Sequence, residues 1–488
     1  MDYNNAINEF INYALHHRLI KKNDICYIGN RLIDLLKLDN FTYESFKHNK
    51  TIDDVLNSLL DIAINNNIIN DSTLERDLFD TKIMNLVTPM PREVEAKFKE
   101  YYAKSPKNAL SYLYNLSVDT NYVRLNRSLN DLEWKSSSKY GELSISINLA
   151  KPEHDPKEYA FYKKIERAKV MYPKCMLCRE NVGFSGSMIA HPNTNLRFAS
   201  IKLDGKDFFI YFSPYSYYKE HCHIVSYEHE PMEISDRTLV RLTEFVDKFP
   251  NYFIGSNADL PIIGSSVLSH EHYKGGVFDF PIEKAQTILR KTIDGVTFEY
   301  LNWPLTTFKL TTNDKDKLIS LGNKIIHKWK KYSCPEINIV SEGTVNHNSV
   351  TLSVRKVEAN YILYIALRNN RFDDKQLYGY FHPDESLHHI KKENIGIVEV
   401  MGMAILPGRL HKELEILRKV LNGVYSEDYL DEIKVHKKWY LSLKGRTYTE
   451  ADIHNEVAKK FERILECCNV FRYASRDYVI DFIDSIER

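Results

Sequence analysis

The sequence predicts a mixed α/β (α+β) fold in which two strand-rich blocks lie between helical segments at both ends of the chain. Apolar residues recur at helical spacing before about residue 119, strand-like alternation follows, and a second strand-rich block at 336–369 precedes another helical run. The 488 residues suit roughly three domains of about 150 residues each. We expect a helical region at 1–118, a half with the candidate catalytic motifs at 119–330, and a second strand-rich half with a helical tail at 331–488.

The N-terminal region has the pattern of amphipathic helices. One run has apolar residues at three-to-four spacing, namely Leu56, Leu59, Leu60 and Ala63. A second run, from Pro91 to Leu116, places Val94 and Phe98 on a comparable stripe. We expect these helices to form an appendage or a cover over the rest of the chain.

Strand signals dominate the middle of the chain. The segment YGELSISINLA alternates with period two, and DFFIYFSPYSYY and HCHIVSY are rich in aromatic and β-branched residues. The two strand-rich blocks admit a duplicated architecture, although no short-period repeat supports it. In the tail, Gly423 stands where a helix should end, after leucines at helical spacing: Leu410, Leu414, Leu417 and Leu421.

Composition limits the function classes. Lysine plus arginine (66) balance aspartate plus glutamate (66), so no long-range field attracts nucleic acid or an anionic membrane. No apolar run reaches the roughly 18 residues of a membrane span. The start, MDYNNAINEF, lacks the basic and apolar regions of a signal peptide, and the seven dispersed cysteines suit a reducing compartment. We expect a cytoplasmic protein in which any phosphate chemistry is local.

The most informative segment is DLPIIGSSVLSHEHYKGGVFDF, residues 259–280. If His270 and His272 lie on a strand, its period of two places both imidazoles on one face. One histidine can then bind a metal while the other acts as a nucleophile. Gly275 and Gly276 follow, and without a Cβ they let a phosphate approach the backbone. By itself H-x-H is a weak pattern. The alternative is a pair of surface or core histidines that has no catalytic or metal-binding role.

A second motif is the C-x-x-C pair in YPKCMLCREN. Two thiolates at this spacing can converge on one zinc ion, which needs two further nitrogen or sulfur ligands. The alternative is a pair of small buried side chains, but the preceding proline and the polar residues that follow favour a metal turn. Candidates for the remaining ligands are His221, His223, His229 and His270.

Two arginines, Arg124 and Arg127, lie in NYVRLNR at the start of the strand-rich body. A guanidinium suits two-point contact with phosphate, although R-x-x-R pairs more often lie on a solvated face.

Taken together, these motifs identify a resemblance. DLPIIGSSVLSHEHYKGG resembles the active-site motif of the second class of galactose-1-phosphate uridylyltransferases, which are distant relatives of the histidine-triad superfamily. Nearly the whole chain is covered, because further segments are similar in the same order: TPMPREVEAKF, SINLAKPEHDPKE, YPKCMLCREN, EHCHIVSYEHEPM and LHHIKKENIGIVEVMGMAILPGRL. The resemblance implies a histidine-triad-like fold with mixed, largely antiparallel sheets.

The resemblance also implies a ping-pong nucleotidyl transfer of the Leloir pathway. His272 would attack the α-phosphorus of UDP-glucose, release glucose 1-phosphate and pass the uridylyl group to galactose 1-phosphate. A structural zinc ion would be bound by Cys175, Cys178, His229 and His270, although His221 and His223 lie close to His229 in the sequence. Substrate contacts would come from Arg124, Arg127, Asn257, Lys274, Gly275 and Gly276.

The chain departs from the family pattern at two positions. The family usually has glutamine where this chain has Lys274 and glycine where it has Ser265. A lysine replaces a fixed neutral donor with a mobile charge. Two other readings stay open: a nucleotidyl hydrolase or phosphorylase that uses the same histidine, and a zinc-ordered nucleotide-sugar-binding protein without catalysis. The expected partners are the two small substrates, with no nucleic acid and no membrane; a homodimer is left open.

Overall fold

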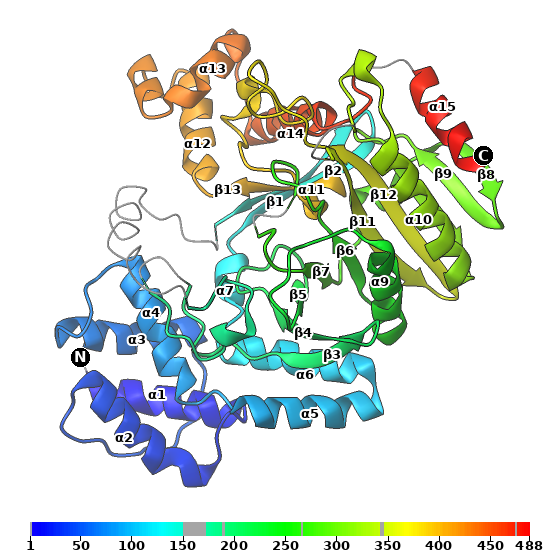
Figure 1. The fold of residues 1–488 in the computed structure, drawn as a ribbon. Coiled ribbons are helices and arrows are strands. Elements are labelled where there is room, and N and C mark those ends of the chain that lie inside the picture. Colours follow the sequence, from blue (N-terminus) through cyan, green and yellow to red (C-terminus); the bar gives the residue numbers. More distant parts are fainter. Residues whose placement is uncertain (1, 150–171, 188–190, 265–266, 342–345, 474–475) are drawn as a thin grey trace.

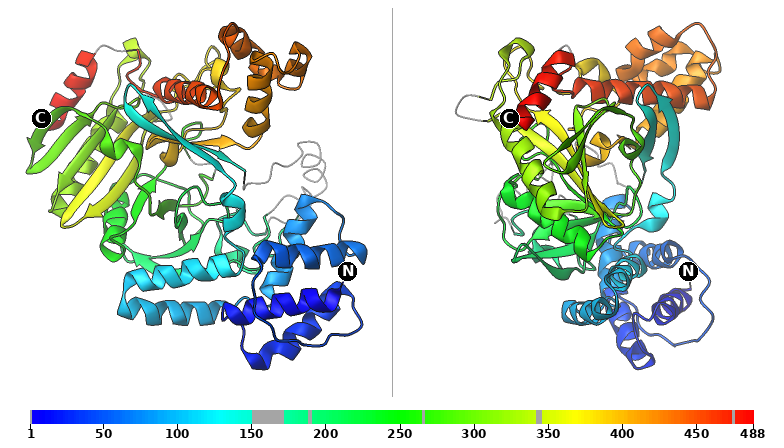
Figure 2. Two further views of the ribbon diagram at one scale, coloured as in Figure 1. Left: turned by 180° about the vertical axis from the view of Figure 1, so that it is seen from behind. Right: turned by 90° about the vertical axis from the view of Figure 1, so that its right-hand side faces the viewer.

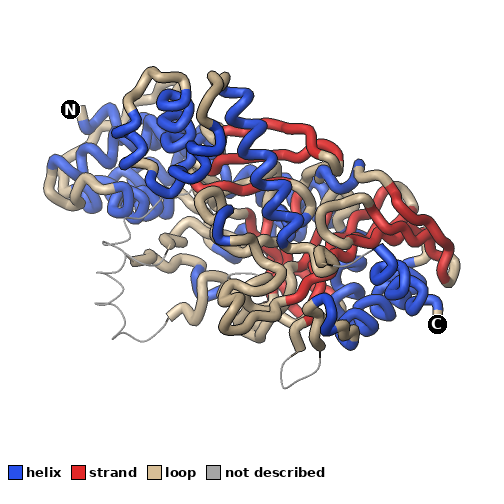
Figure 3. Tube along the Cα trace, turned by 90° about the horizontal axis from the view of Figure 1, so that it is seen from above, coloured by secondary structure: helices blue, strands red, loops and turns tan. Residues whose placement is uncertain are grey.

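The computed structural model describes residues 2–149, 172–187, 191–264, 267–341, 346–473 and 476–488. Helices gather at both ends of the chain around a strand-rich body, and the two termini lie at opposite ends of the molecule (Figures 1 and 3). The mixed α/β class expected from the sequence is confirmed, including its largely antiparallel strand pairing.

The first four helices form a separate group with its own apolar core. Figures 1 and 2 show this group at one end of the molecule. Its core contains Ile7, Phe10, Leu32, Leu59 and Ile83. The helices are α1 (Tyr3–His16), α2 (Ile25–Leu36), α3 (Ile52–Asn65) and α4 (Thr73–Asn85).

The next two helices, α5 (Pro91–Lys104) and α6 (Pro106–Asp119), pack elsewhere. Val94 and Leu113 join the main core beneath the large sheet. Residues 1–118 therefore contain two packing units, an appendage of four helices and a pair that covers part of the sheet. Short helix α7 (Leu125–Ser128) follows.

The described strands form one ten-stranded sheet in the order β3-β4-β5-β7-β6-β11-β12-β10-β9-β8, in which every pairing is antiparallel. Their bounds are β3 (Ala199–Leu203), β4 (Lys206–Phe212), β5 (Cys222–Ser226), β6 (Phe253–Ser256), β7 (His272–Gly276), β8 (Thr287–Ile293), β9 (Val296–Leu301), β10 (Thr307–Thr312), β11 (Asn348–Val357) and β12 (Asn360–Asn369). The expected boundary at residue 330 thus falls within one continuous sheet.

This sheet consists of two halves with the same topology. In the first half three strands, helix α9 (Asp236–Lys248) and two strands give the order β3-β4-β5-β7-β6. In the second half three strands, helix α10 (Lys315–Lys331) and two strands give β8-β9-β10-β12-β11. The halves meet where β6 pairs with β11. The sheet is therefore duplicated in topology, but its second half begins at Thr287, inside the segment 119–330 that the sequence analysis assigned to one half.

The two faces of the sheet differ in what covers them. Helices α5, α6, α9 and α10 and the last helix, α15 (Arg476–Glu487), supply the core of one face. The other face packs partly against a small sheet, in the order β1-β2-β13, and the C-terminal helices. These elements are β1 (Leu132–Ser138), β2 (Gly141–Asn148), α11 (Ile397–Val400), β13 (Met403–Pro407), α12 (Leu410–Leu421), α13 (Lys437–Leu443) and α14 (Glu450–Cys467).

Helix α12 ends as its sequence predicts. It spans Leu410–Leu421, and Gly423 follows with a φ of 69°, a left-handed conformation that glycine adopts without a Cβ penalty. Among the described residues no helix combines the length and the apolar character needed to cross a membrane.

Candidate active site and metal centre

Two cysteines and two histidines converge on one point just before β7. The sulfur and ring-nitrogen atoms of Cys175, Cys178, His229 and His270 all lie within 4.8 Å of one another. Sγ of Cys175 lies 3.3 Å from Nδ1 of His270, and Sγ of Cys178 lies 3.1 Å from Nδ1 of His229. Two sulfur and two nitrogen donors in this arrangement fit a tetrahedral ion such as Zn²⁺. The structure thus brings together the four residues that the sequence nominated as metal ligands.

Backbone and side-chain hydrogen bonds orient several of these metal-ligand candidates. The Asn181 amide donates to the carbonyl oxygens of Cys175 and Cys178, at 2.9 and 2.8 Å, and so fixes the turn between the thiols. Nε2 of His270 lies 2.9 Å from the carbonyl oxygen of Ser226 and donates to it, which leaves Nδ1 to face the thiols. Burial and the Cys175 thiol raise the pKa of Cys178 to about 11, so its thiolate form needs a neighbouring cation.

His272 is the first residue of β7 and is buried. Its Nδ1 lies 2.8 Å from the carbonyl oxygen of His270, so Nδ1 carries the proton and Nε2 carries the lone pair in the neutral ring. Burial, and to a smaller extent the charges of Lys274 and His270, lower the pKa of His272 to about 4. The imidazole is therefore neutral at physiological pH.

The register between β5 and β7 gathers further polar groups on the same face as His272. His223 lies opposite Lys274, and Val225 lies opposite His272. The His221 and His223 rings are 5.2 Å apart between centroids, and burial lowers the pKa of each well below its ordinary value. Among the described residues, neither ring nitrogen of His221 nor Nδ1 of His223 has a hydrogen-bond partner. Buried polar atoms without a protein partner indicate a place for a bound polar group.

The second half of the sheet reaches this face through α11. The side-chain oxygen of Asn257 accepts a hydrogen bond of 2.7 Å from the backbone N–H of Ile397. Burial lowers the pKa of Lys274, the Glu399 carboxylate opposes that shift, and the charge of Lys391 adds to it. Lys391 is itself 3.1 Å from Glu399. The charges of Lys391 and Glu399 therefore act on Lys274.

The two nominated arginines are already engaged by carboxylates of α4. Arg124 is buried and donates from Nη1 and Nη2 to the two oxygens of Asp80, at 2.6 and 3.0 Å. Arg127 makes the same two-point contact with Asp77, at 3.0 and 2.5 Å. These pairs tie the four-helix appendage to the strand-rich body. Substrate contact by either arginine stays a prediction.

The two glycines after Lys274 have packing reasons of their own. A Cβ on Gly276, whose φ is 152°, would lie 2.6 Å from the Tyr218 ring. A Cβ on Gly275 would lie 3.0 Å from the carbonyl oxygen of Phe253. Close strand packing therefore demands glycine here, and a phosphate contact stays a prediction.

Some site groups were not singled out for this role by the sequence. The sequence marks His221 and His223 only as candidate metal ligands, although their spacing of two residues on a strand predicts a shared face. Glu399 and Lys391 reach the site from a segment far along the chain, which no local pattern could reveal. Ser265, and residues 150–158 of the segment SINLAKPEHDPKE, lie outside the described residues.

Comparison with known proteins identifies the family of this chain. The family models for the N-terminal and C-terminal domains of galactose-1-phosphate uridyl transferase match residues 18–231 and 244–441. Galactose-1-phosphate uridylyltransferases of Clostridium acetobutylicum and Bacillus subtilis are 42% and 38% identical to this chain; each alignment covers 96% of the chain and 96% and 95% of the relative, respectively. A solved structure of yeast Ap4A phosphorylase Apa2 aligns with a TM-score of 0.34 and 12% identity over 66% of this chain and 90% of that one. On the family models and the two relatives, the chain belongs to the galactose-1-phosphate uridyl transferase family.

Proposed function

We propose that this chain is a nucleotidyltransferase, a UDP-glucose–hexose-1-phosphate uridylyltransferase. It converts UDP-glucose and galactose 1-phosphate into glucose 1-phosphate and UDP-galactose, a reaction of galactose metabolism. The observation that carries the proposal is the neutral, buried imidazole of His272, held by the carbonyl of His270 beside a cluster of metal-binding side chains. The near full-length relatives of the same name support it.

In the first step Nε2 of His272 attacks the α-phosphorus of UDP-glucose. A phosphorus–nitrogen bond forms, the bond from that phosphorus to the bridging oxygen breaks, and glucose 1-phosphate leaves with the electron pair. The leaving group is a phosphate, so no strong general acid is required. The hydrogen bond from Nδ1 to the His270 carbonyl stabilises the positive ring of the uridylyl-histidine.

In the second step a phosphate oxygen of galactose 1-phosphate attacks the same phosphorus. The phosphorus–nitrogen bond breaks, UDP-galactose forms, and His272 returns to its neutral state with its proton still on Nδ1. The incoming oxygen is already ionised at neutral pH, so no general base is required. A rigid nucleophile and well-placed donors then supply most of the catalysis.

Lys274 is proposed as the donor that stabilises the transferring phosphoryl group. It lies two residues after His272 on the same strand, so its side chain emerges on the same face. Its ammonium group replaces the neutral amide that is usual in the family and adds a charge next to the developing negative oxygens. Asn257, Arg124, Arg127 and the backbone of Gly275 and Gly276 are proposed as further substrate contacts.

Zinc is the proposed metal, bound by Cys175, Cys178, His229 and His270. The donor set fits it, because structural zinc sites are tetrahedral with four thiolate or imidazole ligands, and two cysteines with two histidines are a common combination. When bound, it supplies a structural cross-link between the C-x-x-C turn and the segment that ends at His272. A cytoplasmic location and a homodimer stay predictions.

The test is to incubate the protein with UDP-glucose that is radiolabelled at the α-phosphate and to isolate the protein at alkaline pH. We expect label on the wild type and on the control His327→Ala, an exposed histidine of α10, but none on His272→Ala. Addition of galactose 1-phosphate should release the label as UDP-galactose. Equal labelling of His272→Ala, or release only to water or inorganic phosphate, would overturn the proposal.

A further inference from the structure

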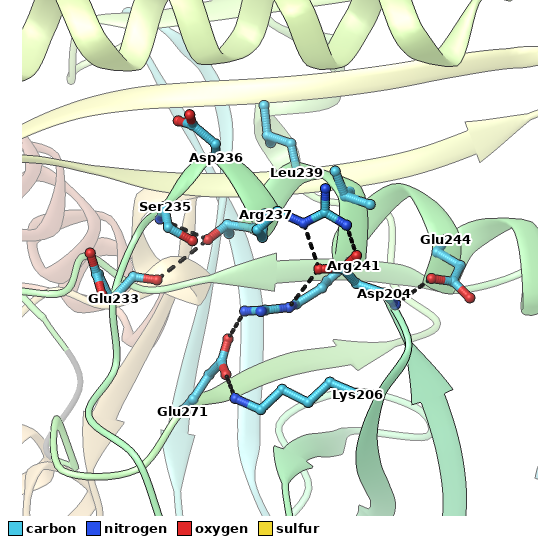
Figure 4. A network of polar contacts seen from close by, with 12 residues as sticks. Asp204, Lys206, Glu233, Ser235, Asp236, Arg237, Leu239, Arg241, Glu244 and Glu271 are labelled. Carbon is cyan, nitrogen blue, oxygen red and sulfur yellow. Dashed lines mark hydrogen bonds and ion pairs between the residues drawn. The ribbon is translucent and has the colours of Figure 1, made fainter. Parts of the chain in front are cut away.

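Glu271, the residue between His270 and His272, belongs to a network of charges with Lys206, Arg241 and Asp204 (Figure 4). Side chains alternate along an extended segment, so the Glu271 side chain faces away from its two neighbours. Its side chain is 4% exposed. One carboxylate oxygen accepts from Nη1 of Arg241 at 2.5 Å and from the Tyr273 hydroxyl at 2.6 Å. The other accepts from Nζ of Lys206 at 3.1 Å. A carboxylate buried this deeply is tolerated because three donors satisfy it.

The Lys206 ammonium links Glu271 to a second segment of the site. It also forms an ion pair with Glu230, the residue that follows His229. Glu271 in turn follows His270. One side chain on β4 therefore holds the residues that come directly after both histidines of the metal cluster.

Backbone hydrogen bonds reinforce this link. The N–H of Glu271 donates to the carbonyl oxygen of Glu230 at 2.7 Å, and the N–H of Ser226 donates to the carbonyl oxygen of Glu271 at 3.0 Å. The carbonyl of Ser226 is also the acceptor for the His270 ring. Displacement of Glu271 would therefore move the Ser226 carbonyl, which orients the His270 ring, and the His270 carbonyl, which orients the His272 ring.

The network is anchored in regular structure. Arg241 lies on α9, and the guanidinium of Arg237, one turn earlier, donates to Asp204 at 2.7 Å. Asp204 also receives an ion pair from Arg241, at 3.7 Å. A helix and a strand thus fix the position of the Glu271 carboxylate.

We propose that Glu271 is a positioning residue, which together with Lys206 and Arg241 forms a clamp that sets the His270 ring against the metal cluster and the His272 ring against the substrate. The inference rests on the roles proposed above for these two histidines. The clamp acts through the backbone of residues 270–272, because the Glu271 carboxylate is bound by Lys206, Arg241 and Tyr273. Loss of the clamp should loosen metal binding and slow transfer together.

The test compares Glu271→Gln with the wild type, using purified protein loaded with Zn²⁺ or with Co²⁺. Glutamine keeps the shape but removes the charge that holds Lys206 and Arg241. We expect metal loss to a chelator to become easier by about 10- to 100-fold, which is typical for the outer partners of metal-ligating histidines. The visible ligand-field spectrum of the Co²⁺ protein should shift, and kcat should fall with little change in KM for galactose 1-phosphate.

Glu299 supplies a matched control. Its side chain is 3% exposed, Arg290 and Lys309 bind it at 2.6 and 3.3 Å, and it lies on β9, five strands or roughly 24 Å from β7. Glu299→Gln should lower Tm without any change in metal retention or in the Co²⁺ spectrum.

Lys206→Met provides a second variant if Glu271→Gln does not fold, because Lys206 is more exposed. Metal retention and a spectrum equal to those of the wild type in the folded variant would overturn the proposal, as would equal losses in Glu299→Gln. The metal measurements need no substrate. Absence of labelled His272 in the wild type would therefore reject the proposed function without affecting the test of the clamp.

Discussion

The His272 ring is oriented by the backbone of His270: its Nδ1 lies 2.8 Å from that carbonyl oxygen, while the His270 ring faces the Cys175 sulfur at 3.3 Å. One short segment therefore holds both the proposed nucleophile and a proposed metal ligand. Uridylyl transfer should depend on the bound metal, because the cluster fixes the segment that carries His272. Metal binding should not depend on the His272 ring, because that ring is not one of the four donors.

We expect Cys175→Ser to lose zinc and to transfer uridylyl groups at least about tenfold more slowly, because the turn no longer holds the segment before His272. His272→Ala should lose transfer and keep its full zinc content. Zinc is measured by atomic absorption, and transfer by release of glucose 1-phosphate. Full zinc in Cys175→Ser, or zinc loss in His272→Ala, would contradict this linkage.

Lys274 predicts a distinctive pH dependence. Burial lowers its pKa, so the ammonium loses its proton at a lower pH than an ordinary lysine does. Transfer by the wild type should therefore fall on the alkaline side as that charge is lost. Lys274→Gln, which carries no charge at any pH, should lack this alkaline decline. At neutral pH it should lose about 1 kcal/mol of stabilisation, or roughly fivefold in rate, because hydrogen bonds from charged donors are stronger.

The measurement is kcat/KM from neutral pH to about pH 10, with enzyme stability checked at each pH. Lys284→Gln, which changes a lysine outside the His272 strand, serves as the control and should keep the decline of the wild type. An alkaline decline of the same shape in Lys274→Gln would show that another group causes it.

For the buried histidine His221 we expect a substitution that preserves stability to weaken substrate binding. Neither ring nitrogen of His221 has a hydrogen-bond partner among the residues that the structure describes. His221→Phe removes these unsatisfied atoms and keeps the ring contacts with Tyr217 and Tyr218, so Tm should hold or rise. If the His221 ring binds the substrate, KM for UDP-glucose should rise by about tenfold in His221→Phe, because one hydrogen bond to a charged group is lost.

Thermal unfolding and initial-rate kinetics test this prediction together. Tyr217→Phe, which changes a neighbour of His221 and keeps the aromatic ring, separates the effect of packing. A lower Tm with an unchanged KM for His221→Phe would mean that His221 only packs the sheet.

The sequence predicted the fold class and the two local motifs, but not the contacts between distant segments. The H-x-H and C-x-x-C motifs are local, because their ligands or reactive groups must stand a few residues apart on one turn or strand. The motifs alone left His221, His223, His229 and His270 open as partners of the two cysteines, and only the family resemblance implied the set of four, whose members come from three separate segments. In contrast, the need for glycine at position 276 comes from the Tyr218 ring, which another part of the chain contributes.

The sequence did not locate the two halves of the sheet, because equal topology does not require equal sequence. The two halves also differ where the chemistry lies. Residues 257–271 connect β6 to β7 and carry the first histidine of the pair, whereas residues 358–359 alone connect β11 to β12. The two arginines pair with Asp80 and Asp77, which lie in the helical appendage. The residues around R-x-x-R do not indicate these partners.

Arg124 presents the sharpest choice between a structural and a substrate-binding role. Its pairing with Asp80 is buried, and burial raises the pKa of that carboxyl. Arg124→Met leaves the carboxyl without its partner and should cost about 3 kcal/mol in the free energy of unfolding. The double variant Arg124→Met/Asp80→Leu removes both charges and should recover most of this loss, because well-packed apolar residues replace buried ion pairs at little cost.

Denaturant unfolding and the KM for UDP-glucose separate the two roles. If Arg124 only joins the helical appendage to the body, the stable double variant should bind and transfer like the wild type. If Arg124 also contacts a substrate phosphate, as the resemblance implies, KM should stay raised by about tenfold or more after stability has returned, because one charge-assisted contact is lost. We expect the raised KM; full recovery of KM in the double variant would assign Arg124 to the fold alone.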